Sequence, residues 1–186
     1  MNWQNISYLN SGSAIQKRAF KSLHELQIFE LLAEYSPILT GTIPIGISID
    51  SSDLDITCRF MNADKFEKKL ESLFGEQKEF KIQKKEKNGY WIVVASFTYQ
   101  NFPFEIFGSL FPATDQNSYR HMLIEHRILQ LLGEDFKQKV IQLKKEGLKT
   151  EPAFAKLFKF DGDPYLKLLD MKGITDTEIL QHWNMS

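Results

Sequence analysis

Asp53 and Asp55 stand two positions apart at the start of the segment DLDITCRF, in which polar and apolar residues alternate. This alternation predicts a β-strand over residues 53–60. Side chains on a strand alternate between its two faces, so both carboxylates are expected to point the same way, and Leu54 and Ile56 are expected to point to the core. Two neighbouring carboxylates repel each other unless a cation neutralises them. Mg²⁺ suits this role, because it binds one or two carboxylates together with phosphate oxygens and water.

A third acid, Glu105, stands in the otherwise apolar strand predicted at 102–108. An acid in such a strand is costly unless it is exposed, paired or bound to a metal ion. If this strand lies beside the strand of Asp53 and Asp55, the three carboxylates could hold two metal ions about 3.5–4 Å apart, as in enzymes of phosphoryl displacement. Acids in such patterns are often simply exposed to solvent. On these three residues alone, a metal site and a set of solvated acids therefore both stay open as interpretations.

The loop before the two aspartates, residues 41–52, is rich in Gly, Pro and Ser. Gly41 and Gly46 allow backbone N–H groups to approach a phosphate closely, and Thr42 adds a hydroxyl donor. Ser52 directly precedes the first aspartate. This loop therefore favours a phosphate-binding role for the acids that follow it.

Hydrophobic periodicity predicts the elements that must position these residues. Helices are expected at residues 14–35 and 63–74, and strands at 38–40, 53–60, 79–86, 90–99 and 102–108. The dipeptide Asn88-Gly89 predicts a hairpin turn, because both of its positions need a positive φ. Beyond Pro112 no further strand is expected, and helices are predicted at 117–132, 135–146, 151–158 and 175–183, with Thr175 and Glu178 as a capping box.

A second polar cluster lies in the predicted helix NSYRHMLIEHRIL. His121 and Glu125 share one helix face, and Arg120 and Arg127 share another. The His and Glu spacing matches neither HExxH nor HxxEH, and no third zinc ligand is evident. Two interpretations remain: a salt-bridged helix face, or a polar wall for nucleotide or acceptor to which Arg120, His121, Glu125 and Lys149 contribute.

The glycines, the hydroxyl residues and the acids together resemble the nucleotidyltransferase superfamily related to DNA polymerase beta. That family has a Gly-Ser, a second Gly, a Ser-Asp-x-Asp and a later third acid. The matching residues here are Gly41, Thr42, Gly46, Ser52, Asp53, Asp55 and Glu105. The resemblance covers roughly residues 14–110. Thr42 keeps the hydroxyl of the usual Ser, but the apolar segment between the glycines lacks the Arg that many relatives carry.

Within the superfamily, the chain resembles a bacterial family labelled a domain of unknown function. The shared segments are GTIPIG, SDLDI, FEIFG, YRHMLIEHR and LKTEPAFA. The expected fold is α+β, a nucleotidyltransferase-like mixed β-sheet with flanking helices. The core is predicted over residues 1–112, and a helical extension packed on it is predicted over residues 113–186.

The resemblance also implies a mechanism. Asp53, Asp55 and Glu105 would bind Mg²⁺ or Mn²⁺, and Gly41 and Thr42 would contact the β- and γ-phosphates of a nucleoside triphosphate. An acceptor hydroxyl would attack the α-phosphorus while pyrophosphate leaves. Glu105 would hold the second metal ion and is a candidate to accept the hydroxyl proton.

The chain has 186 residues and a net charge of −1, which argues against long nucleic acids as partners. Its lysine clusters are interpreted as solvated faces or as a rim that attracts phosphate. Their members are Lys78, Lys81, Lys84, Lys85, Lys87, Lys137, Lys139, Lys144, Lys145 and Lys149. Tyr90, Trp91 and Tyr99 in the hairpin are interpreted as sheet packing, with base stacking as the alternative.

Cys58 is the only cysteine, so no intrachain disulfide and no cysteine-rich zinc site is expected. The first residues lack a signal-peptide pattern and no apolar run reaches about 18 residues, so we expect a cytoplasmic protein without a membrane partner.

We therefore expect a metal-dependent nucleotidyltransferase that uses a nucleoside triphosphate and an unknown acceptor, which is a small molecule, a protein or an RNA end. The three acids favour this enzyme. The alternative is a non-catalytic nucleotide-binding or protein-interaction module of the same fold, an antitoxin-like partner included. The apolar segment between the two glycines favours that alternative.

Overall fold

The computed structural model describes residues 2–185 of the chain. Two groups of residues each form a unit with its own internal contacts. The sheet unit consists of residues 2–46 and 51–119, and the helical unit consists of residues 47–50 and 120–185. Each unit is described by itself below.

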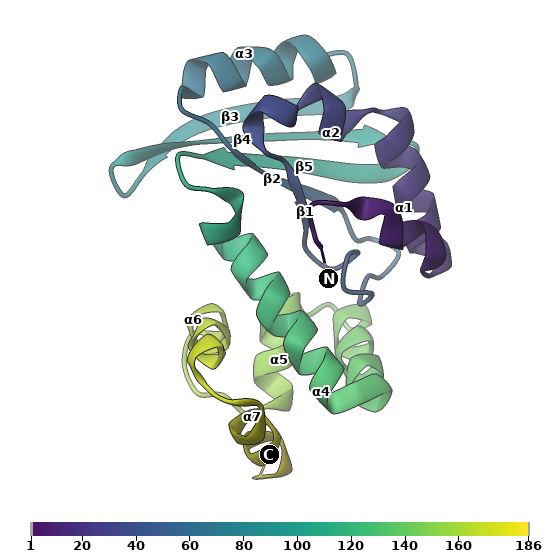
Figure 1. The fold of residues 1–186 in the computed structure, drawn as a ribbon, viewed down its shortest axis with the longest axis vertical. Helices are drawn as coiled ribbons and strands as arrows, with labels where there is room; N and C mark the ends of the chain where they lie inside the picture. The colour runs from purple at the N-terminus through teal and green to yellow at the C-terminus, as the bar shows by residue number, and fades with distance from the viewer. Residues whose placement is uncertain (1, 186) are drawn as a thin grey trace. The chain divides into compact units, whose positions relative to one another are not determined.

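A five-stranded mixed sheet organises the sheet unit, with the strand order β1-β2-β5-β4-β3 (Figure 1). Its strands are β1 (Ile38–Thr40), β2 (Leu54–Arg59), β3 (Lys78–Lys87), β4 (Tyr90–Tyr99) and β5 (Phe102–Ser109). The pair β2 and β5 is parallel, and the other neighbouring pairs are antiparallel. The predicted α+β class with a mixed sheet and flanking helices is therefore confirmed.

One face of the sheet is covered by helices. Leu54 and Ile56 of β2 belong to the same buried cluster as Phe66, Leu70 and Phe74, which lie on one side of α3 (Ala63–Phe74). This helix begins at Asn62, whose side chain accepts a hydrogen bond of 2.9 Å from the backbone N–H of Lys65. The alternation along β2 thus sends its apolar residues to the helices and leaves Asp55 and Thr57 on the opposite face.

The first predicted helix is shorter than its periodicity suggested. α1 (Ala14–Glu25) starts at a capping box formed by Ser13 and Gln16, and α2 (Ile28–Leu31) follows after a break. Gln27 separates the two helices with a φ of 51°, in the left-handed region. Both helices bury apolar residues in the same core, so the spacing of apolar residues continues through the break at Gln27. For this reason the hydrophobic periodicity predicted one continuous helix instead of two.

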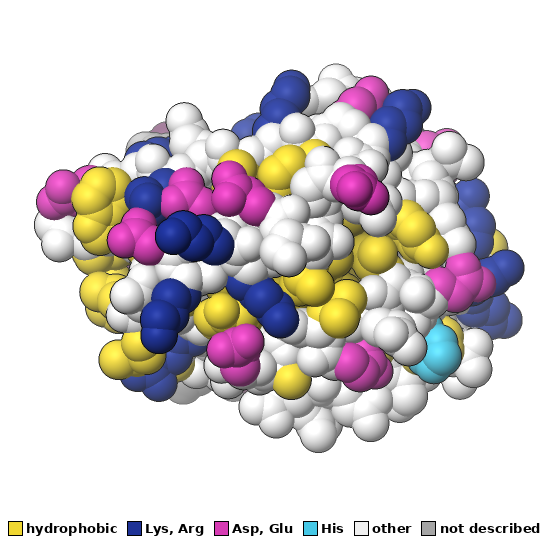
Figure 2. All heavy atoms as spheres, turned by 90° about the horizontal axis from the view of Figure 1, so that it is seen from above, with side chains coloured by type: hydrophobic (Ala, Val, Ile, Leu, Met, Phe, Trp, Pro, Cys, Tyr) yellow, Lys and Arg dark blue, Asp and Glu magenta, His cyan; other side chains and the backbone are white. Residues whose placement is uncertain are grey.

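The β3–β4 hairpin agrees with its sequence signal. Asn88 and Gly89 have φ values of 53° and 82°, the positive angles that a two-residue turn of this kind requires. The strands pair in register from Lys87 and Tyr90 at the turn. On the helix-covered side, Lys84 of β3 lies 2.6 Å from carboxylate oxygens of both Asp64 and Glu67 of α3. Figure 2 looks onto this side and shows basic and acidic side chains interspersed, rather than one continuous basic surface.

The helical unit contains four α-helices within the described residues 120–185. They are the greater part of α4 (Asn117–Lys145), α5 (Thr150–Leu157), α6 (Pro164–Asp170) and α7 (Asp176–Met185). Gly133 interrupts α4 with a φ of 74°, at the break predicted between residues 132 and 135. Phe136, Phe154 and Trp183 meet in its core, with ring centroids 5.5 and 5.0 Å from Phe136.

The predicted capping box before α7 is also formed. The Glu178 carboxylate accepts from the backbone N–H of Thr175 at 2.6 Å, and the Thr175 hydroxyl accepts from the backbone N–H of Glu178 at 3.3 Å. These bonds satisfy backbone donors that the helix itself leaves open. None of the helices formed by residues 2–185 has the length and hydrophobicity needed to span a bilayer.

Candidate functional site

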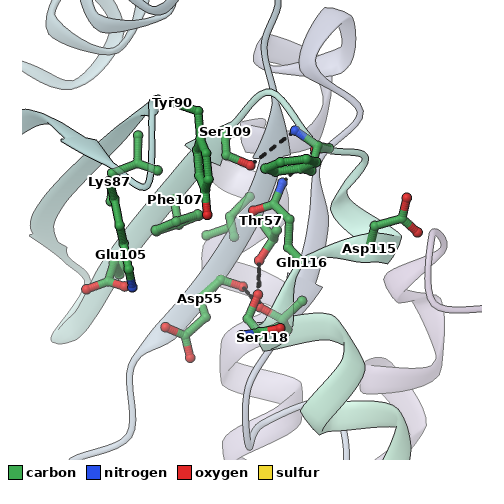
Figure 3. A pocket seen from close by; sticks show the side chains of 15 residues that line it. Asp55, Thr57, Lys87, Tyr90, Glu105, Phe107, Ser109, Asp115, Gln116 and Ser118 are labelled. Carbon is green, nitrogen blue, oxygen red and sulfur yellow. Dashed lines mark hydrogen bonds between the residues drawn. The ribbon is translucent and has the colours of Figure 1, made fainter. Parts of the chain in front are cut away.

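A cavity of about 430 Å³ lies on the face of the sheet that carries Asp55 and Thr57. Its walls come from β1, β2, the β3–β4 hairpin, β5 and the segment 115–118, all within the sheet unit (Figure 3). Its volume falls within the range of roughly 300–1,000 Å³ that is typical of small-molecule sites. The cavity contains two of the three predicted acids.

Asp55 and Glu105 are direct partners across the parallel β2–β5 pair. Neighbouring strands lie about 4.8 Å apart, and partnered residues of a parallel pair project to the same face. Both acids line the cavity, and Figure 3 shows their side chains on the same side of the sheet. The expectation that the strand of Glu105 lies beside the strand of Asp55 is therefore met.

Asp53 takes a different place. It directly precedes β2 instead of lying within it, its side chain is exposed, and it is not among the residues that line the cavity. Within residues 2–185, no three His, Cys, Asp or Glu side chains are arranged so that they could hold a metal ion by themselves. The expected three-acid cluster is thus represented by two acids in register and a third on the adjoining loop.

The glycine loop contacts Asp55 directly. Gly41 has a φ of 77°, and a Cβ atom at this position would overlap the Oδ2 atom of Asp55. Only glycine therefore combines this backbone angle with space for the carboxylate. Gly41, to which the resemblance assigns a phosphate contact, therefore also determines where the Asp55 carboxylate lies.

Other loop residues support this arrangement. Thr42 donates its hydroxyl to the Ser52 hydroxyl at 3.3 Å, which links the two ends of the loop. Gly46 has a φ of 75°, and its backbone N–H donates to the carbonyl of Ile43 at 3.2 Å. Ile43 is buried in the core of the sheet unit, so the apolar segment between the glycines anchors the loop.

Three hydroxyl groups connect the cavity floor to its wall. Thr40 and Thr57 lie 3.0 Å apart through their Oγ1 atoms, and Thr57 lies 2.8 Å from the Oγ atom of Ser118. The chain of hydroxyls thereby ties β1 and β2 to the segment that follows β5. These bonds tie Ser118, at the start of α4, to the cavity face of β2.

The far end of the cavity contains residues that the sequence patterns did not assign. Tyr90 and Phe111 pack edge to face with ring centroids 4.9 Å apart. Lys87, the strand partner of Tyr90, and Gln116 also line the cavity. Tyr90 and Lys87 belong to the aromatic and basic groups noted in the hairpin, so alternation on β3 and β4 could have indicated their common face. Gln116 follows a short 3-10 helix and has no sequence signal of its own.

The remaining predicted binding residues, Arg120, His121, Glu125 and Lys149, belong to the helical unit. His121 is buried, with its Nδ1 atom 3.3 Å from the Glu151 carboxylate and its Nε2 atom 3.0 Å from the carbonyl of Tyr165. Both ring nitrogens therefore hold α4 to its neighbours in this unit. A part for these residues in nucleotide binding stays a prediction.

Glu125 is buried in the helical unit. Its burial, together with the nearby Glu151 carboxylate, raises the pKa of Glu125 to about 8, although the Lys144 ammonium opposes the shift. A carboxyl whose pKa in the folded state exceeds its unfolded value stabilises the fold at low pH and loses this effect as pH rises. The helical unit thus contains a carboxyl that is protonated near neutral pH.

We expect Glu125→Gln to remove a pH-dependent loss of stability. Between pH 5 and pH 8, the free energy of unfolding of the native protein should fall by about 1 kcal/mol or more relative to the variant, because only native Glu125 must ionise in a buried place. Thermal and urea unfolding at several pH values measure this difference. The matched control Asp161→Asn, at an exposed position, should follow the native curve. Parallel curves for native and Glu125→Gln proteins would contradict the assignment.

The lysines of the helical unit have structural partners. Lys144 is buried and donates to the backbone carbonyl of Ile47 at 2.9 Å. Lys139 lies over the ring of Trp183 at 5.2 Å, and Lys137 lies 3.8 Å from the Glu134 carboxylate. The interpretation of this cluster as a solvated face does not hold for Lys144, because its side chain is buried.

The donor chemistry of the cavity suits a magnesium ion carried by a triphosphate. Carboxylate oxygens are the ligands that Mg²⁺ prefers, and one or two of them are enough when phosphates and waters complete the octahedron. Asp55 and Glu105 supply two such carboxylates from rigid strands, and Asp53 lies two residues from the first of them.

The chain is similar in fold to proteins of known structure. The fold resembles Cid1 poly(U) polymerase, a nucleotidyltransferase-fold enzyme. The MgGTP-bound structure has a TM-score of 0.53 and 14% sequence identity, and the match covers 82% of this chain and 47% of that one. The Mg 3′-dATP-bound structure has a TM-score of 0.54 and 15% sequence identity, and the match covers 87% of this chain and 51% of that one.

A third Cid1 structure, described for its RNA terminal uridylyl transferase activity, has a TM-score of 0.54 and 13% identity, and the match covers 87% of this chain and 50% of that one. The chain thus spans about half the length of these structures, and at such identities the similarity shows the fold alone.

No curated protein is significantly similar to the chain. A family model does match it, over residues 21–171, which include β1 to β5, the cavity acids and the helices as far as α6. The match covers most of the sequence. The chain therefore belongs to the family described as "Domain of unknown function (DUF4269)".

Proposed function

We propose that the protein is a metal-dependent nucleotidyltransferase, which transfers a nucleoside monophosphate from a nucleoside triphosphate to an acceptor hydroxyl. One observation carries this proposal: Asp55 and Glu105 lie opposite each other on parallel strands and line one cavity. The structures of Cid1 with MgGTP and with Mg 3′-dATP support it, because they share this fold and hold a nucleotide with magnesium.

The residues of the sheet unit would divide the work between them. Asp55 and Glu105 would hold Mg²⁺, and Asp53 would join them when the triphosphate brings the ion. The ion, when bound, neutralises charge on the phosphates. Gly41 and Thr42, at the Asp55 end of the cavity, would contact the β- and γ-phosphates through a backbone N–H and a hydroxyl. Asp55 and Glu105 lie on paired strands, so their carboxylates need little rearrangement when the metal ion binds.

The reaction makes one bond and breaks one bond. The acceptor oxygen forms a bond to the α-phosphorus, and the bond from that phosphorus to the bridging oxygen of the β-phosphate breaks. Pyrophosphate leaves with the bonding electrons, and the hydroxyl proton passes to the Glu105 carboxylate as general base. Positioning and charge neutralisation supply most of the rate in such transfers.

A second candidate is a nucleotide-binding module without catalysis. Two observations favour it: Asp53 lies outside the cavity lining, and the segment Ile43, Pro44 and Ile45 offers no cationic side chain to the phosphates. Such a module would bind a triphosphate without releasing pyrophosphate. Measuring pyrophosphate release in the presence of acceptors separates the two candidates.

Calorimetry with each nucleoside triphosphate, with and without Mg²⁺, tests the proposed site. We expect the native protein to bind at least one triphosphate more tightly with Mg²⁺. Asp55→Asn and Glu105→Gln should lose this dependence on magnesium, because a neutral amide oxygen lacks the negative charge with which a carboxylate binds the cation. Glu71→Gln, on the exposed side of α3, is the matched control and should bind like the native protein. Equal binding by native and cavity variants, or binding by none of them, would count against the site.

A further inference from the structure

Gln116 lies in the cavity wall and has a buried hydrogen-bond acceptor that no group within the described residues satisfies. The residue is 7% exposed and lines the cavity (Figure 3). Its Nε2 atom donates to the carbonyl of Cys58 at 2.8 Å and to the carbonyl of Phe111 at 2.9 Å. Its Oε1 atom is buried and has no hydrogen-bond partner among residues 2–185.

The orientation of this amide is determined by its neighbours. Both hydrogens of the Nε2 atom are used by backbone carbonyls, and a flipped amide would place its oxygen against those same two carbonyl oxygens. The Oε1 atom therefore remains an acceptor in a fixed place. Buried acceptors are satisfied in the great majority of cases, so this atom indicates a ligand with a hydrogen-bond donor.

Aromatic rings flank the same end of the cavity. Tyr90 and Phe111 both line it, and Phe111 is 46% exposed although its ring is large and apolar. An exposed aromatic ring beside a buried acceptor is suited to a flat ligand, which can stack on the ring and donate from its edge. Free nitrogen heterocycles, nucleobases among them, combine a flat face with N–H donors at the edge.

The direction of β2 and β5 indicates whether the triphosphate or the acceptor would reach the Gln116 end of the cavity. Asp55 lies near the start of β2, next to Gly41, and its partner Glu105 lies in the middle of β5, whereas Ser109 ends β5 four residues beyond Glu105. Four residues of a strand span about 13 Å. In phosphoryl transfer the attacking and leaving oxygens lie roughly in line. If pyrophosphate leaves towards Gly41, the acceptor enters from the opposite side, along the cavity.

We propose that the far end of the cavity is the acceptor site, and that the acceptor is a small molecule with a planar nitrogen heterocycle that donates an N–H to the Oε1 atom of Gln116. Tyr90 and Phe111 stack on the ring or pack against its edge. This proposal rests on the proposed nucleotidyl transfer for its direction. The donor and the flat ring are inferred from the cavity itself.

Binding of free nucleosides to the native protein, without metal or triphosphate, tests the ring site. Adenosine, guanosine, cytidine and uridine serve as probes, followed by NMR or calorimetry. At least one should bind, and its analogue methylated at the donor nitrogens (N3-methyluridine in the case of uridine) should bind about tenfold more weakly or worse, because Gln116 Oε1 then stays unsatisfied. Equal affinity for a nucleoside and its methylated analogue, or no binding of any nucleoside, would overturn the proposal.

A pair of variants checks the stacking surface without disturbing the Gln116 amide. Tyr90→Ala should weaken nucleoside binding about fivefold or more, since base stacking on an aromatic ring contributes substantially to affinity. Trp91→Ala is the matched control on the same strand. Its ring lies 5.9 Å from the ammonium of Lys84, which binds acids of α3 on the opposite face. Equal loss in both variants would mean that the far end is not the binding surface.

Competition separates this inference from the proposed function. A saturating magnesium triphosphate should leave nucleoside binding intact, because the two ligands occupy different ends. Displacement would make the far end the base subsite of the triphosphate, which overturns the acceptor assignment but leaves nucleotidyl transfer standing. If nucleosides bind but no magnesium triphosphate does, the proposed function fails and the acceptor assignment fails with it. An oligoribonucleotide that ends in the same base is a further probe. If it binds more than tenfold tighter than the nucleoside, the acceptor is an RNA end, and the assignment of a small-molecule acceptor is overturned.

Discussion

Gly41→Ala is expected to lower the magnesium-dependent affinity for a nucleoside triphosphate by about tenfold to a hundredfold, the range found when a group that orients a metal ligand is lost. The added Cβ atom overlaps Oδ2 of Asp55, so the carboxylate must leave the place where it faces Glu105. The substitution removes no polar side chain and no charge. Its effect therefore reports the position of Asp55 and the approach of the phosphates to Gly41, rather than the presence of an acid.

A matched variant isolates this contact from backbone strain. Gly89 has a φ of 82°, close to the 77° of Gly41, and a Cβ atom at Gly89 would meet no atom within 4 Å. Gly89→Ala and Gly41→Ala thus share the cost of a left-handed alanine, about 1–2 kcal/mol. We expect similar losses of thermal stability in both, but a loss of magnesium-dependent binding only in Gly41→Ala. Native-like binding by Gly41→Ala would show that magnesium-dependent binding does not depend on the position of the Asp55 carboxylate next to Gly41.

Gly108→Ala is expected to lower the free energy of unfolding by about 2–3 kcal/mol, near the upper end of the usual cost of overpacking a core. Gly108 lies in β5 on the helix-covered face, and an added Cβ atom would overlap the Phe66 ring and lie 3.0 Å from Cδ1 of Phe60. Both rings are fully buried, so neither can move aside without opening the core. Urea unfolding monitored by tryptophan fluorescence measures the change.

The control for this second result is Gly173→Ala in the helical unit. Gly173 has no positive φ, and a Cβ atom there would meet nothing within 4 Å, so its stability should stay within about 0.5 kcal/mol of the native value. Combining Gly108→Ala with Phe66→Leu should recover part of the loss, because the smaller side chain leaves room for the methyl group. If the double variant is as unstable as the sum of the two single variants, the contact is not the cause.

Local chemistry predicted features of both units from the sequence. The Asn88-Gly89 turn, the capping box of Thr175 and Glu178, and the break at Gly133 depend on residues within a few positions of each other, and the structure contains each of them. Alternation along β2 likewise predicted that Leu54 and Ile56 are buried while Asp55 faces the other way. These features follow from backbone angles and side-chain periodicity, which act at short range.

Periodicity failed where two helices bury residues in the same core. The predicted helix at 14–35 is divided at Gln27, which takes a left-handed conformation although nothing in its residue type requires one. The strand of the two aspartates begins one residue later than predicted, at Leu54, and this leaves Asp53 on the loop. Element ends depend on tertiary contacts that alternation does not encode.

The sequence by itself determined which residues could form the site: the acids, the glycine loop that precedes them and the α+β class. Only the tertiary structure decided that β2 pairs with β5 in parallel and in register, which brings Asp55 and Glu105 together across fifty positions of sequence. It also decided that Gln116, in the cavity wall, has a buried acceptor without a partner among the described residues, and that Gly41 makes room for a carboxylate. The physical reason is that pairing between distant strands, and the space between their side chains, depend on the packing of the whole core rather than on any local pattern.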